Sequence, residues 1–189
     1  MIWKRTAAER NERFQTREED GQQYIEGYFA VFGSQYWLWD GAYETIEQGA
    51  FDGETTKDVR ALANHDTSLV LGRTTAGTLT LREDEKGLWG CITINPKDQD
   101  AVNLYERVKR GDISQCSFGF DIVEQDAEYN EGAPTVWRIK KVKLYEVSVV
   151  TFPAYEDTSV EARRQEYESI KKRKTEQWRE QMKGRLKGE

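Results

Sequence analysis

The feature that most constrains the fold is the stretch between residues 22 and 152. It is rich in β-branched and aromatic residues, and Gly, Asn and Asp divide it into short runs. Runs of this kind are typical of strands joined by turns, because β-branched and aromatic side chains fit a pleated sheet. We therefore predict a mostly antiparallel β domain. Its expected strands cover residues 24–32, 42–46, 58–63, 69–74, 78–83, 88–94, 116–125, 135–142 and 144–151.

Two segments predict helices instead. Apolar residues recur at helical spacing between 101 and 108, with Asp98 and Asp100 near the start and Gly111 just past the end, as in a capped helix. After residue 153 the chain becomes charged and helix-forming, which predicts a long, thinly amphipathic helix. The expected organisation is a charged N-terminal arm over residues 1–21, a β domain over 22–160 and a basic helical tail over 161–189. We expect the arm to be a frayed helix that carries no chemistry.

Composition excludes several classes of protein. The 189 residues contain no apolar run near the roughly 18 residues that span a bilayer, and the start lacks the apolar core of a secretory signal. Two cysteines and one histidine do not form a usual zinc site, so we expect a reducing cytoplasm and no metal. The phosphate-binding glycine motifs and the G-x-S-x-G elbow are also absent, so we expect no nucleotide cofactor and no α/β-hydrolase.

Charge is distributed unevenly along the chain. The net charge is −6, but residues 161–189 hold ten Lys or Arg against six Glu, so the tail carries +4 and the preceding residues carry −10. The tail is therefore a separate electrostatic unit. A nucleic-acid-binding module that acts through the tail is disfavoured by the acidic β domain, and we expect neither nucleic acid nor membrane as a partner.

His65 and Ser117 are the candidates for base and nucleophile. His65 ends a predicted strand and is the only histidine, so any chemistry assisted by an imidazole must use it. Alternation along the strand places Ser117 and Gly119 on one face, where the glycine would leave room for a substrate backbone. The same alternation turns Cys116, a rival nucleophile, toward the apolar face, where burial makes a thiol inert.

A carboxylate is needed to orient such an imidazole, and Glu146 is the first candidate. It interrupts an otherwise apolar strand, where an unpaired buried charge would be costly. A Glu146 that faces water from an edge strand is an equally good interpretation of the sequence. Asp66 and Asp121 are rival candidates for the acid of a Ser–His–acid set.

Several segments, taken in order, resemble the prohead (capsid maturation) serine proteases of tailed bacteriophages. The resemblance extends from about residue 24 to about residue 164. Its blocks are 25–32 (IEGYFAVF), 43–51 (YETIEQGAF), 62–66 (LANHD), 71–74 (LGRT) with 77–79 (GTL), 110–113 (RGDI), 117–120 (SFGF) and 146–155 (EVSVVTFPAY). One departure from the common pattern is 114–116 (SQC), where an acidic residue and glycine are frequent.

The resemblance implies both a fold and a site. It implies His65 as base, Ser117 as nucleophile and Glu146 as the third member. The family is similar in fold to the herpesvirus assembly proteases, which implies an α+β protein: a mostly antiparallel β-barrel ringed by a few helices, here with a long charged C-terminal helix. The herpesvirus enzymes use a second histidine as third member, which this chain cannot supply.

The resemblance also implies substrates and surroundings. These are the phage scaffolding protein or scaffolding segment, the major capsid protein and the protease itself, cleaved inside the assembling prohead in the bacterial host cytoplasm. A second copy of the chain is a further candidate partner. We expect the basic tail to bind an acidic helical scaffold and to be removed later by self-cleavage. The alternative is a non-catalytic capsid assembly or scaffolding module with the same fold.

Overall fold

The computed structural model describes residues 3–6, 15–129, 132–152 and 157–186. In this part of the chain, eleven strands, one short 3-10 helix and two α-helices are formed. The strands are β1 (Trp3–Thr6), β2 (Gln15–Glu19), β3 (Gln22–Val31), β4 (Tyr36–Trp39), β5 (Ala42–Ile46), β6 (Arg60–Ala63), β7 (Asp66–Arg73), β8 (Leu79–Glu83), β9 (Gly87–Thr93), β10 (Gln115–Glu128) and β11 (Thr135–Val150). The helices are η1 (Thr74–Ala76), α1 (Gln99–Arg110) and α2 (Asp157–Leu186).

The strands are arranged in two sheets. A seven-stranded sheet has the order β1-β10-β11-β5-β4, with β6 paired to β11 and β7 paired to β6; a four-stranded sheet has the order β2-β3-β9-β8. All pairs are antiparallel except those that β11 makes with β5 and β6. The expected α+β class is confirmed. The expected barrel is not formed by the described strands, because no ladder joins the two sheets.

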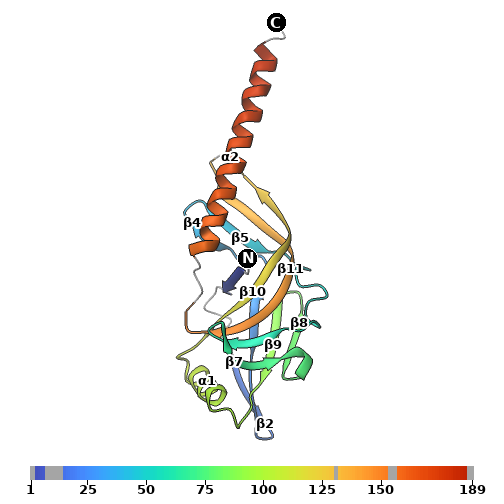
Figure 1. Cartoon of the computed structure of the whole chain (residues 1–189), viewed down its shortest axis with the longest axis vertical. Coiled ribbons are helices and arrows are strands. Elements are labelled where there is room, and N and C mark those ends of the chain that lie inside the picture. Colours follow the sequence, from blue (N-terminus) through green and yellow to red (C-terminus); the bar gives the residue numbers. More distant parts are fainter. Residues whose placement is uncertain (1–2, 7–14, 130–131, 153–156, 187–189) are drawn as a thin grey trace.

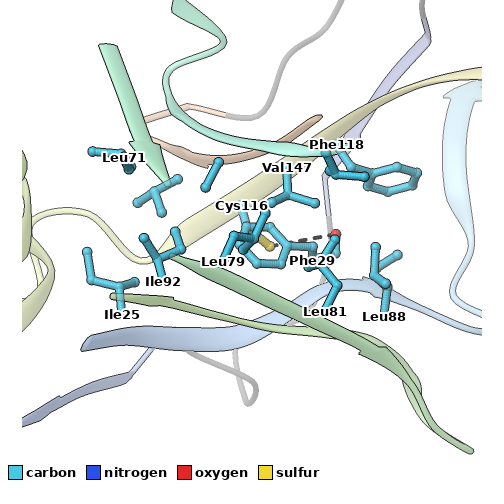
Figure 2. Packing of buried hydrophobic residues seen from close by; sticks show 14 of the residues in the cluster. Ile25, Phe29, Leu71, Leu79, Leu81, Leu88, Ile92, Cys116, Phe118 and Val147 are labelled. Carbon is cyan, nitrogen blue, oxygen red and sulfur yellow. Dashed lines mark hydrogen bonds between the residues drawn. The ribbon is translucent and has the colours of Figure 1, made fainter. Parts of the chain in front are cut away.

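The hydrophobic core lies between the two sheets (Figure 2). Phe118 on β10 and Val147 on β11 contribute from the larger sheet, and Phe29, Leu88 and Ile92 contribute from the smaller one; all are fully buried. Burial of each such side chain stabilises the fold by about 1.5–3 kcal/mol. Because strand residues alternate between faces, Ser117, Glu146 and Ser148 lie on the face of β10 and β11 opposite to this core.

The helix α1 confirms the helix predicted between 101 and 108. The Asp98 side chain accepts hydrogen bonds from the backbone N–H groups of Asp100 (3.0 Å) and Ala101 (3.3 Å). At the other end Gly111 has φ +88°, a left-handed conformation that glycine adopts without strain. The helix therefore begins and ends where its capping residues predict.

The N-terminal arm differs from the expectation of a frayed helix. Its described residues form two strands: β1 pairs with β10, and β2 pairs with β3. Residues 7–14 lie outside the described residues. Two further differences are β4, which we did not expect, and β11, which joins the strands predicted over 135–142 and 144–151. Strand β2 pairs with its neighbour β3 and β4 pairs with its neighbour β5, whereas β1 pairs with the distant β10. In each case strand pairing decides the conformation, because it overrides weak local propensity.

The C-terminal helix α2 is anchored at one end only. Arg163 is 1% exposed and donates hydrogen bonds to Glu44 (3.2 and 3.3 Å) and Glu166 (2.8 Å). Lys174 Nζ donates to the carbonyl oxygen of Tyr129 (2.7 Å), and beyond this point the described side chains are exposed. The helix then projects away from the sheets (Figure 1). Neither α1 nor α2, as described, is apolar over a length that could cross a bilayer.

Candidate active site

His65 lies in a two-residue turn that connects β6 to β7. Ala63 and Asp66 are paired across this turn, and both turn residues have positive φ, +51° at Asn64 and +60° at His65. Two left-handed residues are what the right-handed twist of a tight hairpin requires, and Asn and His adopt this conformation more often than most non-glycine residues. The turn thus holds the imidazole in one place relative to β6.

Asn64 ties this turn to the end of β11. Its backbone N–H donates to the carbonyl oxygen of Val149 (2.9 Å), and its side-chain Oδ1 accepts from the backbone N–H of Thr151 (2.9 Å). Parallel pairing of β6 with β11 continues into the turn through these two bonds. The imidazole that follows Asn64 is therefore held beside β11.

His65 and Glu146 are brought together. His65 Nδ1 lies 2.7 Å from Glu146 Oε1, and the two side chains are 9% and 12% exposed. A carboxylate accepts hydrogen bonds only, so in this contact Nδ1 is the donor, and in a neutral imidazole Nε2 then keeps its lone pair. Nε2 is buried and has no hydrogen-bond partner among the described residues. This is the tautomer that a general base needs.

The second oxygen of Glu146 is also held. Ser148 lies two residues further along β11, and its hydroxyl donates to Glu146 Oε2 at 2.5 Å. Ser148 is fully buried. Since both carboxylate oxygens accept a hydrogen bond, Glu146 is fixed in position. Its strand β11 runs between β10 and the parallel strands β5 and β6, so the interpretation of Glu146 as an exposed residue on an edge strand is wrong.

Ser117 lies on β10 directly opposite Ser148. Opposed residues in adjacent strands point to the same face, so the Ser117 hydroxyl shares a face with Ser148 and Glu146. Ser117 is fully buried, and its Oγ has no hydrogen-bond partner among the described residues, neither His65 nor Glu146. A buried polar group without a partner costs roughly 1–3 kcal/mol and calls for an explanation such as catalysis.

Gly119 makes room for the Glu146 carboxylate. The two residues are opposed on β10 and β11, and a Cβ at position 119 would lie 2.4 Å from Glu146 Oε1. Our expectation that this glycine opens the face to a substrate backbone is therefore wrong, since Glu146 occupies that space. Only a glycine permits the carboxylate to lie across β10.

Replacing Gly119 with alanine is expected to reduce catalysis by about 10²- to 10⁴-fold. The added methyl group displaces Glu146, which leaves the imidazole without its orienting acceptor. The check is the rate at which the scaffolding and capsid proteins are cleaved, measured together with the melting temperature of the variant. Introducing Gly119→Ala into a Glu146→Ala background should cause no further loss of activity, because both changes break the same contact. Additive losses would contradict this explanation.

The rival acids bind other groups. Asp66 is exposed, and its Oδ1 accepts from the backbone N–H (2.8 Å) and hydroxyl (2.6 Å) of Ser68, two bonds that lower the pKa of Asp66. Asp121 accepts from the Tyr145 hydroxyl at 2.6 Å. Of the three candidates, Glu146 is the one that forms a hydrogen bond with the imidazole among the described residues.

Cys116 faces the core, as alternation predicted. It is 3% exposed and its thiol donates to the carbonyl oxygen of Tyr28 at 3.0 Å. Figure 2 shows it in the core near Phe29 and Val147. Alternation along β10 places Ser117 on the opposite face. Within the described ranges, no three His, Cys, Asp or Glu side chains gather where they could hold a metal ion.

Sequence reasoning missed three residues of this site. It assigned no role to Asn64 or Ser148, and it gave Gly119 a different one. The signal for Ser148 is its spacing of two from Glu146, which places both on one strand face. The signal for Asn64 is its position directly before the only histidine, because Asn favours the left-handed conformation of turns.

Comparisons with known proteins identify the family of this chain. The family model of the Caudovirus prohead serine protease matches residues 12–173. The chain is 33% identical over 149 residues to the prohead protease of Enterobacteria phage HK97; the match covers 76% of this chain and 61% of that protein. Its fold resembles that of the bacteriophage T4 capsid assembly protease, with a TM-score of 0.50, 12% identity, and coverage of 80% of this chain and 98% of the other. The chain therefore belongs to the Caudovirus prohead serine protease family.

Proposed function

We propose that this chain is a serine endopeptidase of phage capsid maturation. Its substrates would be segments of the scaffolding and capsid proteins, and the protease itself, inside the assembling prohead. The observation that carries the proposal is the hydrogen bond between His65 and Glu146 on the same sheet face as the buried, unpartnered Ser117 hydroxyl. Family membership and the name of the HK97 relative support the same reaction.

The proposed mechanism is acyl transfer. Ser117 Oγ attacks the carbonyl carbon of a peptide bond while His65 Nε2 accepts the hydroxyl proton. The imidazolium then donates this proton to the leaving amine, the C–N bond breaks, and an acyl-enzyme remains on Ser117. Water, deprotonated by the same Nε2, attacks the ester, releases the acid product and restores the serine.

Glu146 has two roles in this mechanism. It keeps the proton of the neutral imidazole on Nδ1, and it stabilises the imidazolium that forms in each step. Ser148 supports both roles because its hydroxyl holds the second carboxylate oxygen. Ser117 Oγ and His65 Nε2 are both buried without partners, and we infer that they pair when substrate binds, since catalytic hydrogen bonds commonly tighten in the substrate complex.

The test is co-expression of the chain with the capsid and scaffolding proteins of the phage that encodes it. Processing is followed by electrophoresis and by mass spectrometry of the products. The informative variants are Ser117→Ala, His65→Ala and Cys116→Ala. Processing that is identical for the wild-type chain and Ser117→Ala would contradict a serine protease and favour a non-catalytic assembly module.

The tail supports a proposal about docking. The tail, residues 161–189, carries +4, and the part of α2 beyond Lys174 projects from the sheets with Trp178 60% exposed. An acidic helical segment of the scaffold would complement this charge. We propose that the tail docks the enzyme on the scaffold and is removed afterwards by self-cleavage.

Deleting residues 175–189 is expected to lower incorporation into proheads at least about tenfold. The deletion leaves the anchoring contacts of Arg163 and Lys174 in place, so the melting temperature should change little. Immunoblots of purified proheads give the measurement. A full-length variant with Lys171→Glu, Lys172→Glu and Arg173→Glu reverses the basic run that the deletion leaves in place, so it tests charge apart from length and should lower incorporation as well. Unchanged incorporation of both variants would contradict docking through the tail.

A further inference from the structure

The strand β1 covers the edge of β10 beside Ser117. The two strands are antiparallel, with Thr6 opposite Ser117, Lys4 opposite Gly119 and Trp3 opposite Phe120. The other edge of β10 pairs with β11, which carries Glu146. Figure 1 shows β1 as the short dark-blue arrow beside β10. The stretch of β10 that holds the proposed nucleophile is thus the stretch that β1 covers.

The four-residue strand β1 occupies an edge of β10 that another extended chain can take in its place. It is the terminal strand of its sheet, and β10 is its paired neighbour in the described residues. A short edge strand is held mainly by a few main-chain hydrogen bonds and is marginal in isolation. When it leaves, the N–H and C=O groups of β10 near Ser117 form an open edge, which is a template for another extended chain.

The direction and register of β1 suit a substrate. Opposed Cα atoms in an antiparallel pair lie about 4.5–5.5 Å apart, so a strand in this position passes close to the Ser117 side chain. The chain of β1 runs from Trp3, opposite Phe120, toward Thr6, opposite Ser117. A peptide bound in this way would lay the residues before its cleavable bond along 120 to 117 and bring the carbonyl to the nucleophile.

We propose that the edge of β10 over residues 117–120 is the binding site for an extended peptide substrate, and that β1 is its intramolecular competitor. The ligand class is the peptide segment that precedes the cleaved bond, added to the sheet as an antiparallel strand. Main-chain hydrogen bonds supply affinity, so β1 and a substrate compete through their backbones. This inference rests on the proposed function, since it assigns the substrate edge of that same site.

The first test measures the edge without catalysis, in the Ser117→Ala background. Hydrogen–deuterium exchange of the amides at 117–120 is compared between the full chain and a chain that begins at Ala7. Removing β1 is expected to speed exchange at the covered amides at least tenfold, and a synthetic peptide of residues 1–6 at millimolar concentration should restore slow exchange. Unchanged exchange after removal, or no effect of the peptide, would overturn the proposal.

A full-length variant guards against a folding defect in the shortened chain. Lys4→Pro combined with Arg5→Pro removes two consecutive N–H groups, one of which faces β10 in an extended strand. This variant should exchange as fast as the shortened chain. Lys4→Ala combined with Arg5→Ala removes the same charges but keeps both N–H groups, so its exchange should match that of the full chain. Equal effects of the proline and alanine pairs would overturn competition through the backbone.

The second test uses activity and separates the two proposals. With Ser117 present, the chain that begins at Ala7 should process the capsid and scaffolding proteins with kcat/KM raised about tenfold, mostly through a lower KM. If processing depends on Ser117 but is not faster without β1, and exchange is also unchanged, this inference is overturned. The protease assignment then remains intact. If the exchange results are as expected but no form of the chain processes the capsid and scaffolding proteins, the proposed function is overturned instead.

Discussion

Replacing Ser117 with alanine is expected to lower processing of the capsid and scaffolding proteins by at least about 10⁴-fold. The hydroxyl is the proposed nucleophile, and removal of a nucleophile in a Ser–His–acid set leaves only the small residual rate that binding and oxyanion stabilisation support. Processing is measured from product bands over time at matched expression. His65→Ala should give a loss of similar size, because the two residues act as one unit.

The same variant should fold at least as well as the wild-type chain. Ser117 Oγ is buried without a hydrogen-bond partner, so its removal relieves an unsatisfied polar group. We expect an unchanged or slightly higher melting temperature, which excludes unfolding as the cause of inactivity. The matched control is Cys116→Ala on the neighbouring residue, whose side chain faces the core; it should retain processing within a few-fold. Processing that survives Ser117→Ala but not Cys116→Ala would contradict the choice of nucleophile.

Glu146→Gln is expected to lower kcat by about 10²- to 10⁴-fold with little change in KM. Glutamine keeps the shape of the side chain but removes the charge that stabilises the imidazolium, and its amide can present a donor to Nδ1 and so favour the wrong tautomer. Single-turnover processing with excess enzyme reports this step directly. A Ser148→Ala variant, which loses the second hydrogen bond to the carboxylate, should show a smaller loss in the same parameter.

The rival acids provide the controls for this prediction. Asp66→Asn and Asp121→Asn are expected to retain processing within a few-fold, because these carboxylates accept from Ser68 and Tyr145. If Asp121→Asn abolishes processing while Glu146→Gln does not, the assignment of the third member is wrong.

Local features of this fold could be predicted because they depend on neighbours in the sequence. The caps of α1 are set by Asp98 and Gly111, whose own side chain and conformation end the helix. The opposite orientation of Cys116 and Ser117 follows from the alternation of any strand. The long charged helix near the C-terminus was also predictable, although its anchor was not, because Arg163 pairs with Glu44 from a strand 119 residues away.

Other features depend on which strands meet. The described strands form two sheets that no ladder closes, so the barrel expected from the resemblance is not confirmed, and the expected helical arm is replaced by β1 and β2. Propensity and alternation state which residues can form a strand and which face each side chain takes, but they do not state the partner or the register. The parallel pairing of β11 with β5 and β6 has no local signature at all.

For the candidate site, the amino-acid sequence by itself determined the reactive groups: one imidazole, one serine on a strand face away from the core, and three carboxylates that could serve the imidazole. Only the tertiary structure decided among the carboxylates, because the bond between His65 and Glu146 joins residues 81 positions apart through the register of β6, β10 and β11. The tertiary structure also brings the Ser148 hydroxyl to the second oxygen of Glu146 and places the Glu146 carboxylate over Gly119. It pairs β1 with β10 beside Ser117. Side-chain chemistry is a property of single residues, whereas these contacts come from strand pairing between distant parts of the chain.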